Sequence, residues 1–232
     1  MRIVKAISFC MLIGIATVAL TVTSATAAII TLTAQDQGFY RSDGRAGTTV
    51  LPNYLVGLLG SLEHRNFFIF DLSSTTDTIV SATLNIFNPI NGFRSDKSQE
   101  IYKIVEVTGS IDMLAAGTGG ISAFNDLGSG SKYFSIGFGT RETDKVISIR
   151  LFGNALTNLN SGASRFALGG HLISILGDAD QYIFGFTGDV LGTLTLETSS
   201  ITAIPLPAAL PLFLTGLAGI GLLRRRQRQR QA

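Results

Sequence analysis

The sequence has no tryptophan, and its single cysteine, Cys10, lies close to the N-terminus. Residues 28–232 therefore contain no thiol, which excludes disulfides, cysteine nucleophiles and cysteine-ligated metals from that part of the chain. Histidine is almost as scarce, since His64 and His171 are the only two. They are far apart in the sequence and neither has a zinc-type spacing, so we expect ordinary surface or core roles for both.

Motifs of the common enzyme classes are also missing. No Gly-x-Ser-x-Gly segment could present a serine nucleophile, and no glycine-rich loop could cradle a phosphate. Residues 129–132 match Ser-x-x-Lys, but they fall in a Gly/Ser-rich turn without a partner Lys-Thr-Gly, so we interpret the match as chance. We predict a protein that is not an enzyme. A β-sandwich hydrolase or lyase stays open as a further class, because scattered carboxylates could supply an acid and a base.

Negative charge is absent from both ends of the chain. All 16 acidic residues fall between Asp36 and Glu197, whereas seven of the 18 basic residues lie at the two termini. The intervening part holds 11 basic and 16 acidic residues, a formal charge of −5. An acidic body of this kind excludes nucleic acid as the expected partner.

The N-terminus has the pattern of a secretory signal peptide. Arg2 and Lys5 precede an apolar stretch at 6–22, and Ala25-Thr26-Ala27 then forms an A-x-A cleavage site before Ala28. We therefore predict that residues 1–27 form a signal helix and are removed, and that the protein is exported.

The C-terminus combines three features. Residues 204–223 carry no charge, and about 20 apolar residues in a helix suffice to cross a hydrocarbon core of about 30 Å. Prolines crowd the front of this segment, and a basic cluster follows it, which by the positive-inside rule stays in the cytoplasm. The cluster consists of Arg224, Arg225, Arg226, Arg228 and Arg230. The pattern predicts a C-terminal transmembrane helix with the rest of the chain outside.

This tail, residues 204–232, resembles the PEP-CTERM sorting signal. The resemblance rests on Pro205-Leu206-Pro207, the apolar helix and the arginine cluster, together with the predicted signal peptide. Leu206 stands where the commonest form of the motif has Glu. The family occurs on exported proteins of Gram-negative bacteria that make exopolysaccharide, and its tails are processed by a membrane peptidase called exosortase. A plain single-pass anchor, or an apolar helix in a soluble core, remains as an alternative.

The body between these ends, residues 28–203, is expected to form one domain of short strands. Extended segments alternate with Gly-rich turns and show no sustained helical periodicity, which is typical of an antiparallel β-sandwich of jelly-roll type. Short helical turns are expected only at 110–116 and 154–159. The predicted strands are 29–34, 66–72, 79–88, 101–107, 132–138, 145–152, 165–168, 171–176, 182–186 and 190–197.

Two of these segments predict how strands face the core. Phe67-Phe68-Ile69-Phe70 is apolar on both faces, so we expect a central strand covered on both sides. In 79–88, Ala82, Leu84 and Ile86 alternate with polar residues, so one face should be buried and the other exposed. Residues 65–88 also resemble, at the level of fold, the opening of jelly-roll carbohydrate-binding modules.

That likeness makes sugar binding a second hypothesis, with exposed tyrosines as stacking platforms. The candidates are Tyr40, Tyr54, Tyr102, Tyr133 and Tyr182. No cofactor is expected, although a calcium ion bound by loop carboxylates is an open possibility. Its candidate ligands are Asp36 and Asp43 in the first loop, and Asp178 with Asp180 in a later one.

Taken together, the sequence predicts a non-enzymatic exported protein that is held briefly in the inner membrane. Exosortase would then process the tail near Pro205-Leu206-Pro207 and release the body to the cell surface or the exopolysaccharide matrix of a biofilm. The alternative function is a carbohydrate-binding module for extracellular polysaccharide.

Overall fold

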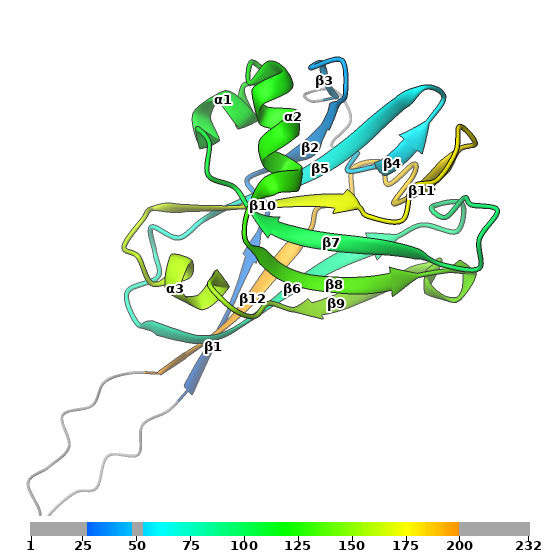
Figure 1. Cartoon of the computed structure of the whole chain (residues 1–232). Coiled ribbons are helices and arrows are strands. Elements are labelled where there is room, and N and C mark those ends of the chain that lie inside the picture. Colours follow the sequence, from blue (N-terminus) through cyan, green and yellow to red (C-terminus); the bar gives the residue numbers. More distant parts are fainter. Residues whose placement is uncertain (1–26, 48–52, 200–232) are drawn as a thin grey trace, which may run out of the picture. The chain divides into compact units, whose positions relative to one another are not determined.

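The computed structural model of the protein describes residues 27–47 and 53–199, all within a single compact unit. These residues form two antiparallel sheets with a few short helices (Figure 1), which confirms the prediction of a mainly β chain with antiparallel strands. The predicted signal helix and transmembrane helix lie outside the described residues. Within the described part, no helix is long and apolar enough to span a bilayer.

The strands divide into a small and a large sheet. The small sheet has the order β1 (Ala27–Thr33), β12 (Thr193–Ser199), β6 (Thr78–Asn88) and β9 (Lys145–Arg150). The large sheet has the order β11 (Gln181–Ile183), β4 (Val56–Leu59), β5 (Leu62–Asp71), β10 (Arg165–Leu172), β7 (Glu100–Glu106) and β8 (Lys132–Phe138). Strands β4 and β10 pair with the two halves of one side of β5, and β2 (Asp36–Arg41) pairs with its other side. Strand β2 in turn pairs with β3 (Ala46–Gly47).

The chain passes repeatedly from one sheet to the other. It runs from β1 in the small sheet to β5 in the large one, returns to β6, and crosses again to β7 and β8. The path continues through β9 in the small sheet and β10 in the large one, and it closes with β12 between β1 and β6. Strands distant in the sequence therefore become neighbours, and most of the core is built from long-range contacts.

The space between the sheets holds the main hydrophobic core. On β6, Ala82, Leu84 and Ile86 are fully buried in it, whereas Thr83 and Asn85 on the other face are half-buried. The predicted alternation of this strand is confirmed. It arises because successive side chains of a strand point to opposite faces, and only one face of the small sheet meets the large sheet.

The large sheet is apolar on both faces where β5 crosses it. Phe68 and Phe70 point into the main core, whereas Phe67 and Ile69 belong to a second cluster on the outer face. This confirms the prediction of a strand covered on both sides. The cover consists of α1 (Ile111–Ala115) and α2 (Gly120–Ser129), which place Leu114, Phe124 and Leu127 onto the sheet.

The second cluster depends on a close approach of α2 to β10. A Cβ atom at Gly169 of β10 would lie 3.0 Å from the Cα of Leu127. A side chain here would have to push the helix away from the sheet by a few tenths of an ångström, so glycine favours the close approach. Figure 1 shows α1 and α2 on the side of the large sheet that faces away from the small one.

Several elements differ from the sequence prediction. The two strands expected at 165–168 and 171–176 are one strand, β10, because Gly169 and Gly170 remain in the ladder with β5 and β7. Strands β2, β3 and β4 were not predicted. Residues 110–116 and 154–159 do contain the short helices α1 and α3 (Ala155–Leu159), but α2 was missed. Its glycines and short polar residues have low helix propensity, and burial of Phe124 and Leu127 overrides it.

The first and last strands lie side by side. In the register of β1 and β12, Ala27 is opposite Ser199 and Thr33 is opposite Thr193. The two ends of the described body therefore leave the same end of the small sheet.

The core assignment of β6 can be tested with a matched pair of substitutions. Leu84→Ala should lower the free energy of unfolding by about 3 kcal/mol, because it leaves a cavity between the sheets. Thr83→Ala, one residue away on the outer face, should cost less than about 1 kcal/mol. Urea unfolding followed by circular dichroism measures both values. Equal losses for the two variants would contradict the orientation of the strand.

Candidate functional site

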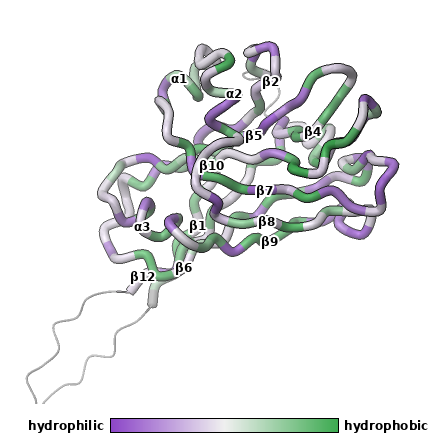
Figure 2. Tube along the Cα trace, viewed as in Figure 1, coloured by the Kyte–Doolittle hydropathy of each residue, from purple (hydrophilic) through white to green (hydrophobic). Residues whose placement is uncertain are grey.

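The outer face of the large sheet is only partly covered by helices. On β5, Phe67 and Ile69 lie under α1 and α2, but Glu63 and Arg65 continue the same face beyond the helices, since alternate residues share a face. On β10 the same face continues from Ala167 to His171. Figure 2 shows the change along β5, from hydrophilic residues in its first half to hydrophobic residues in its second.

The uncovered half contains an open cleft of about 870 Å³. One wall is the hairpin of β4 and β5, and the other is the end of β10 with the loop that leads to β11. The lining combines aliphatic side chains with charged and polar groups. Its residues are Leu58, Gly60, Ser61, Glu63, Arg65, His171, Leu172, Ile173, Ile175, Gly177 and Asp178.

Arg65 is held in a fixed position at the boundary between the cleft and α2. Its Nε donates to Glu63 Oε1 at 2.8 Å, and its Nη1 donates to the carbonyl oxygen of Phe124 at 3.1 Å. The guanidinium also lies 4.1 Å from the centroid of the Phe124 ring. A Cβ atom at Gly128 would lie 2.4 Å from Nη1, so the glycine of α2 makes room for this arginine.

His171 stands at the cleft with an unusual environment. Its residue is 8% exposed, and its Nδ1 is buried with no hydrogen-bond partner in the described part of the chain. Burial, together with the positive charges of Arg65 and Lys103, lowers the pKa of His171 to about 4. The side chain is therefore neutral at physiological pH.

His64 has a different role. Its Nδ1 lies 2.9 Å from the carbonyl oxygen of Leu62, and its ring packs edge-on against Phe39 at 4.9 Å between centroids. Burial lowers the pKa of His64 as well. The expected core role fits His64, whereas His171 lines the cleft, a role that isolated histidines in a sequence do not reveal.

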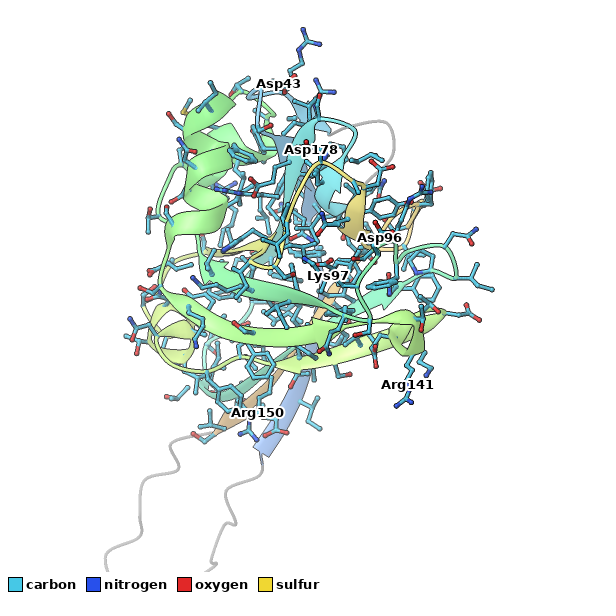
Figure 3. All side chains as sticks on the ribbon, turned by 45° about the vertical axis from the view of Figure 1, so that its right-hand side comes forward. Asp43, Asp96, Lys97, Arg141, Arg150 and Asp178 are labelled. Atoms are coloured by element: carbon cyan, nitrogen blue, oxygen red, sulfur yellow. The ribbon has the colours of Figure 1, made fainter. Side chains whose placement is uncertain are left out.

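A polar network holds the loop between β10 and β11, which forms one cleft wall. The carboxylate of Glu100 is fully buried and accepts hydrogen bonds from Ser95 Oγ and Ser174 Oγ. Lys97 Nζ donates to Gln181 Oε1 at 3.0 Å and lies 3.7 Å from Glu100 Oε1. Lys97 is labelled in Figure 3. Sequence reasoning missed this network because its members come from two segments, 95–100 and 174–181, that lie about 80 residues apart in the chain.

The four carboxylates considered for calcium are not gathered into one site. Asp36 begins β2, whereas Asp43 lies in the turn after it and forms an ion pair with Arg41 at 2.7 Å. Asp180 accepts a hydrogen bond from the Gly60 amide at 2.8 Å, and Asp178 (labelled in Figure 3) lines the cleft. Among the residues that the structure describes, no three histidine, cysteine, aspartate or glutamate side chains group as metal ligands.

The tyrosines considered as sugar platforms are all buried. The exposed fraction is zero for Tyr40 and Tyr54 and 7% for Tyr182, the most exposed of the five. Tyr102 and Tyr133 also belong to the main core. The idea that these rings stack on a sugar is wrong, because their faces are already occupied by the core.

Other predicted site residues fall at element ends or beyond the described part. Ser129 is the last residue of α2 and Lys132 the first of β8, so the expected turn at 129–132 includes a helix end. Ala27 begins β1, and Ala28 pairs with Thr198, but Ala25 lies outside the described residues. So do Pro205, Leu206, Pro207 and the cluster Arg224, Arg225, Arg226, Arg228 and Arg230.

Comparison with models of known protein families, and with curated proteins, found no match to this chain.

The burial of His171 predicts a pH-dependent stability. The unfolded histidine takes up a proton near pH 6.5, whereas the folded one does so only near pH 4. Stability should therefore fall as the pH drops from about 6.5 to 4, by up to about 3 kcal/mol. Urea unfolding at several pH values measures the loss, and His171→Leu should reduce it. If the His171→Leu variant loses as much stability between pH 6.5 and 4 as the wild type, the pH dependence does not come from His171.

Proposed function

We propose that this chain is an exported, non-enzymatic surface protein whose C-terminal tail is a sorting signal of the PEP-CTERM type. The observation that carries the proposal is the pairing of Ala28, the predicted first residue of the mature chain, with Thr198 near the C-terminal end of the described body. The strands of both sheets that the structure describes fall between the predicted signal peptide and the predicted tail, apart from Ala27, the last residue of the predicted signal peptide. Both predicted targeting segments, 1–27 and 204–232, thus join the body within a few residues of one sheet end.

We also infer that the body is a jelly roll. Support comes from the order of its eight main strands, four in each sheet, and from the alternation of the chain between the sheets. Such double Greek-key connections define the jelly roll among two-sheet folds. In this reading β2, β3, β4 and β11 are additions at one side of the large sheet.

Each of the three parts of the predicted tail would have a separate role in sorting. Pro205-Leu206-Pro207 would keep a short segment extended and accessible to a peptidase, since prolines disfavour a helix. The apolar helix would hold it at the inner membrane, and the arginines would fix its orientation. The expected partner is an exosortase of a Gram-negative bacterium, and the expected destination is the cell surface or the exopolysaccharide matrix.

The cleft favours polysaccharide as a ligand of the body. It is open, it is lined by the β4–β5 hairpin and by the end of β10 with the loop that follows, and it presents hydrogen-bonding groups beside aliphatic side chains. Because the tyrosines are buried, the contacts would come from polar groups such as Arg65, Asp178 and Ser61. Hydroxyl groups of a sugar can pair with each of these.

Processing of the tail can be measured directly. Mass spectrometry of the mature protein from its native host should show that the chain begins at Ala28 and has lost the residues after the Pro205-Leu206-Pro207 segment. Replacement of all five arginines by glutamine should leave most molecules with the intact tail, because the helix loses its orientation. Recovery of residues 204–232 on every mature molecule would contradict the sorting function.

Ligand binding by the cleft calls for a separate experiment. Electrophoresis through gels that contain the host exopolysaccharide should retard the protein, and Asp178→Ala should lose this retardation. Asp77→Ala is the matched control, because Asp77 lines another hollow, between the loops at 72–79 and 159–164. Equal migration in gels with and without polysaccharide would remove the binding role and leave the sorting proposal intact.

A further inference from the structure

Strand β1 forms an edge of the small sheet. In the described part of the chain it pairs only with β12, so one side of its backbone has no neighbouring strand. An edge of this kind presents a row of N–H and C=O groups that can pair with another strand.

The sequence of β1 lacks the features that usually protect an edge. It reads Ala-Ala-Ile-Ile-Thr-Leu-Thr, with no charge, no proline and no glycine. The other long edge strands of the two sheets do carry charges, namely Lys132 in β8 and both Lys145 and Arg150 in β9. The short edges β3 and β11 have only two and three residues. Charges and short length both discourage pairing with other chains, so β1 is the one unprotected edge among the described strands.

The side chains of β1 are also incompletely covered. Ile29 is 71% exposed, and Ile30 and Leu32 pack against the main core while remaining only partly buried. A further strand beside β1 would extend both layers and remove more of these apolar surfaces from water. The gain is about 25 cal/mol for each Å² that becomes buried.

We propose that β1 pairs antiparallel with β1 of a second copy of this chain, so that the two small sheets become one continuous sheet. A two-fold axis through the centre of the strand makes the contact isologous, so each copy donates and accepts hydrogen bonds over the same residues. No like charges meet at this seam. The nearest acidic side chain in the register, Glu197 of β12, is opposite Ile29 and lies one strand away from it. The proposal is independent of tail sorting and of polysaccharide binding.

The test compares two matched double variants of the full-length chain purified in detergent. Thr31→Lys with Thr33→Lys places like charges of two copies at the seam, where they repel. Thr195→Lys with Thr193→Lys adds the same charges on β12, directly opposite Thr31 and Thr33 in the register. Light scattering across a concentration series should show dimers for the wild type and the β12 variant, and monomers for the β1 variant. Circular dichroism confirms that each variant is folded.

A cross-linking experiment gives an independent measurement. In a Cys10→Ala background the chain has no other thiol, so Thr31→Cys provides a single reactive site on β1. A short bifunctional thiol reagent should convert this variant to covalent dimers, whereas Thr195→Cys should give few. The proposal is overturned if the wild type is monomeric at about 100 μM, a concentration that should populate a weak dimer. It is also overturned if the β1 and β12 variants dissociate equally, because the contact would then involve the sheet face.

Discussion

Burial of β5 on both faces is the constraint on which the rest of the structure depends. Phe68 and Phe70 can enter the main core only if Phe67 and Ile69 point outward, because neighbouring side chains of a strand alternate. Exposure of these two apolar side chains to water would lower the stability of the fold, so the outer face needs its own cover. The two helices α1 and α2 supply it, and they turn a two-sheet body into a three-layered one over half of the large sheet.

The same strand also explains where the cleft lies. The apolar half of β5 is buried under the two helices. Its polar half, with Glu63 and Arg65, can face water and needs no such cover. Arg65 joins the two halves, because its guanidinium bonds to Glu63 on one side and reaches the backbone and ring of Phe124 in α2 on the other. The uncovered polar half becomes the floor of an open cleft, whose other wall is held by the buried carboxylate of Glu100.

Much of the fold follows from local sequence patterns, and the site does not. The strand orientations at 79–88 and 67–70 are predicted correctly. The first follows from alternation of apolar and polar residues and the second from a run that is apolar on both faces, and both patterns can be seen within a few neighbouring residues. Helix α2 escapes such reasoning, since its stability comes from contacts of Phe124 and Leu127 with a sheet that the sequence pattern does not reveal. The cleft escapes it as well. His171, Arg65 and Asp178 come together only through the pairing of β5 with β10 and the path of the loop before β11.

The side-by-side placement of Ala27 and Ser199 has a mechanical consequence. Force applied to both of these residues at once would peel β1 from β12 one hydrogen bond at a time, which is the weakest way to load a pair of antiparallel strands. A force applied at Ser199 alone loads the body differently. The pull then enters β12, which is flanked by β1 and β6, and it acts along the strand against two ladders of hydrogen bonds together. A load on Ser199 alone would thus be carried by one of the better supported strands of the small sheet.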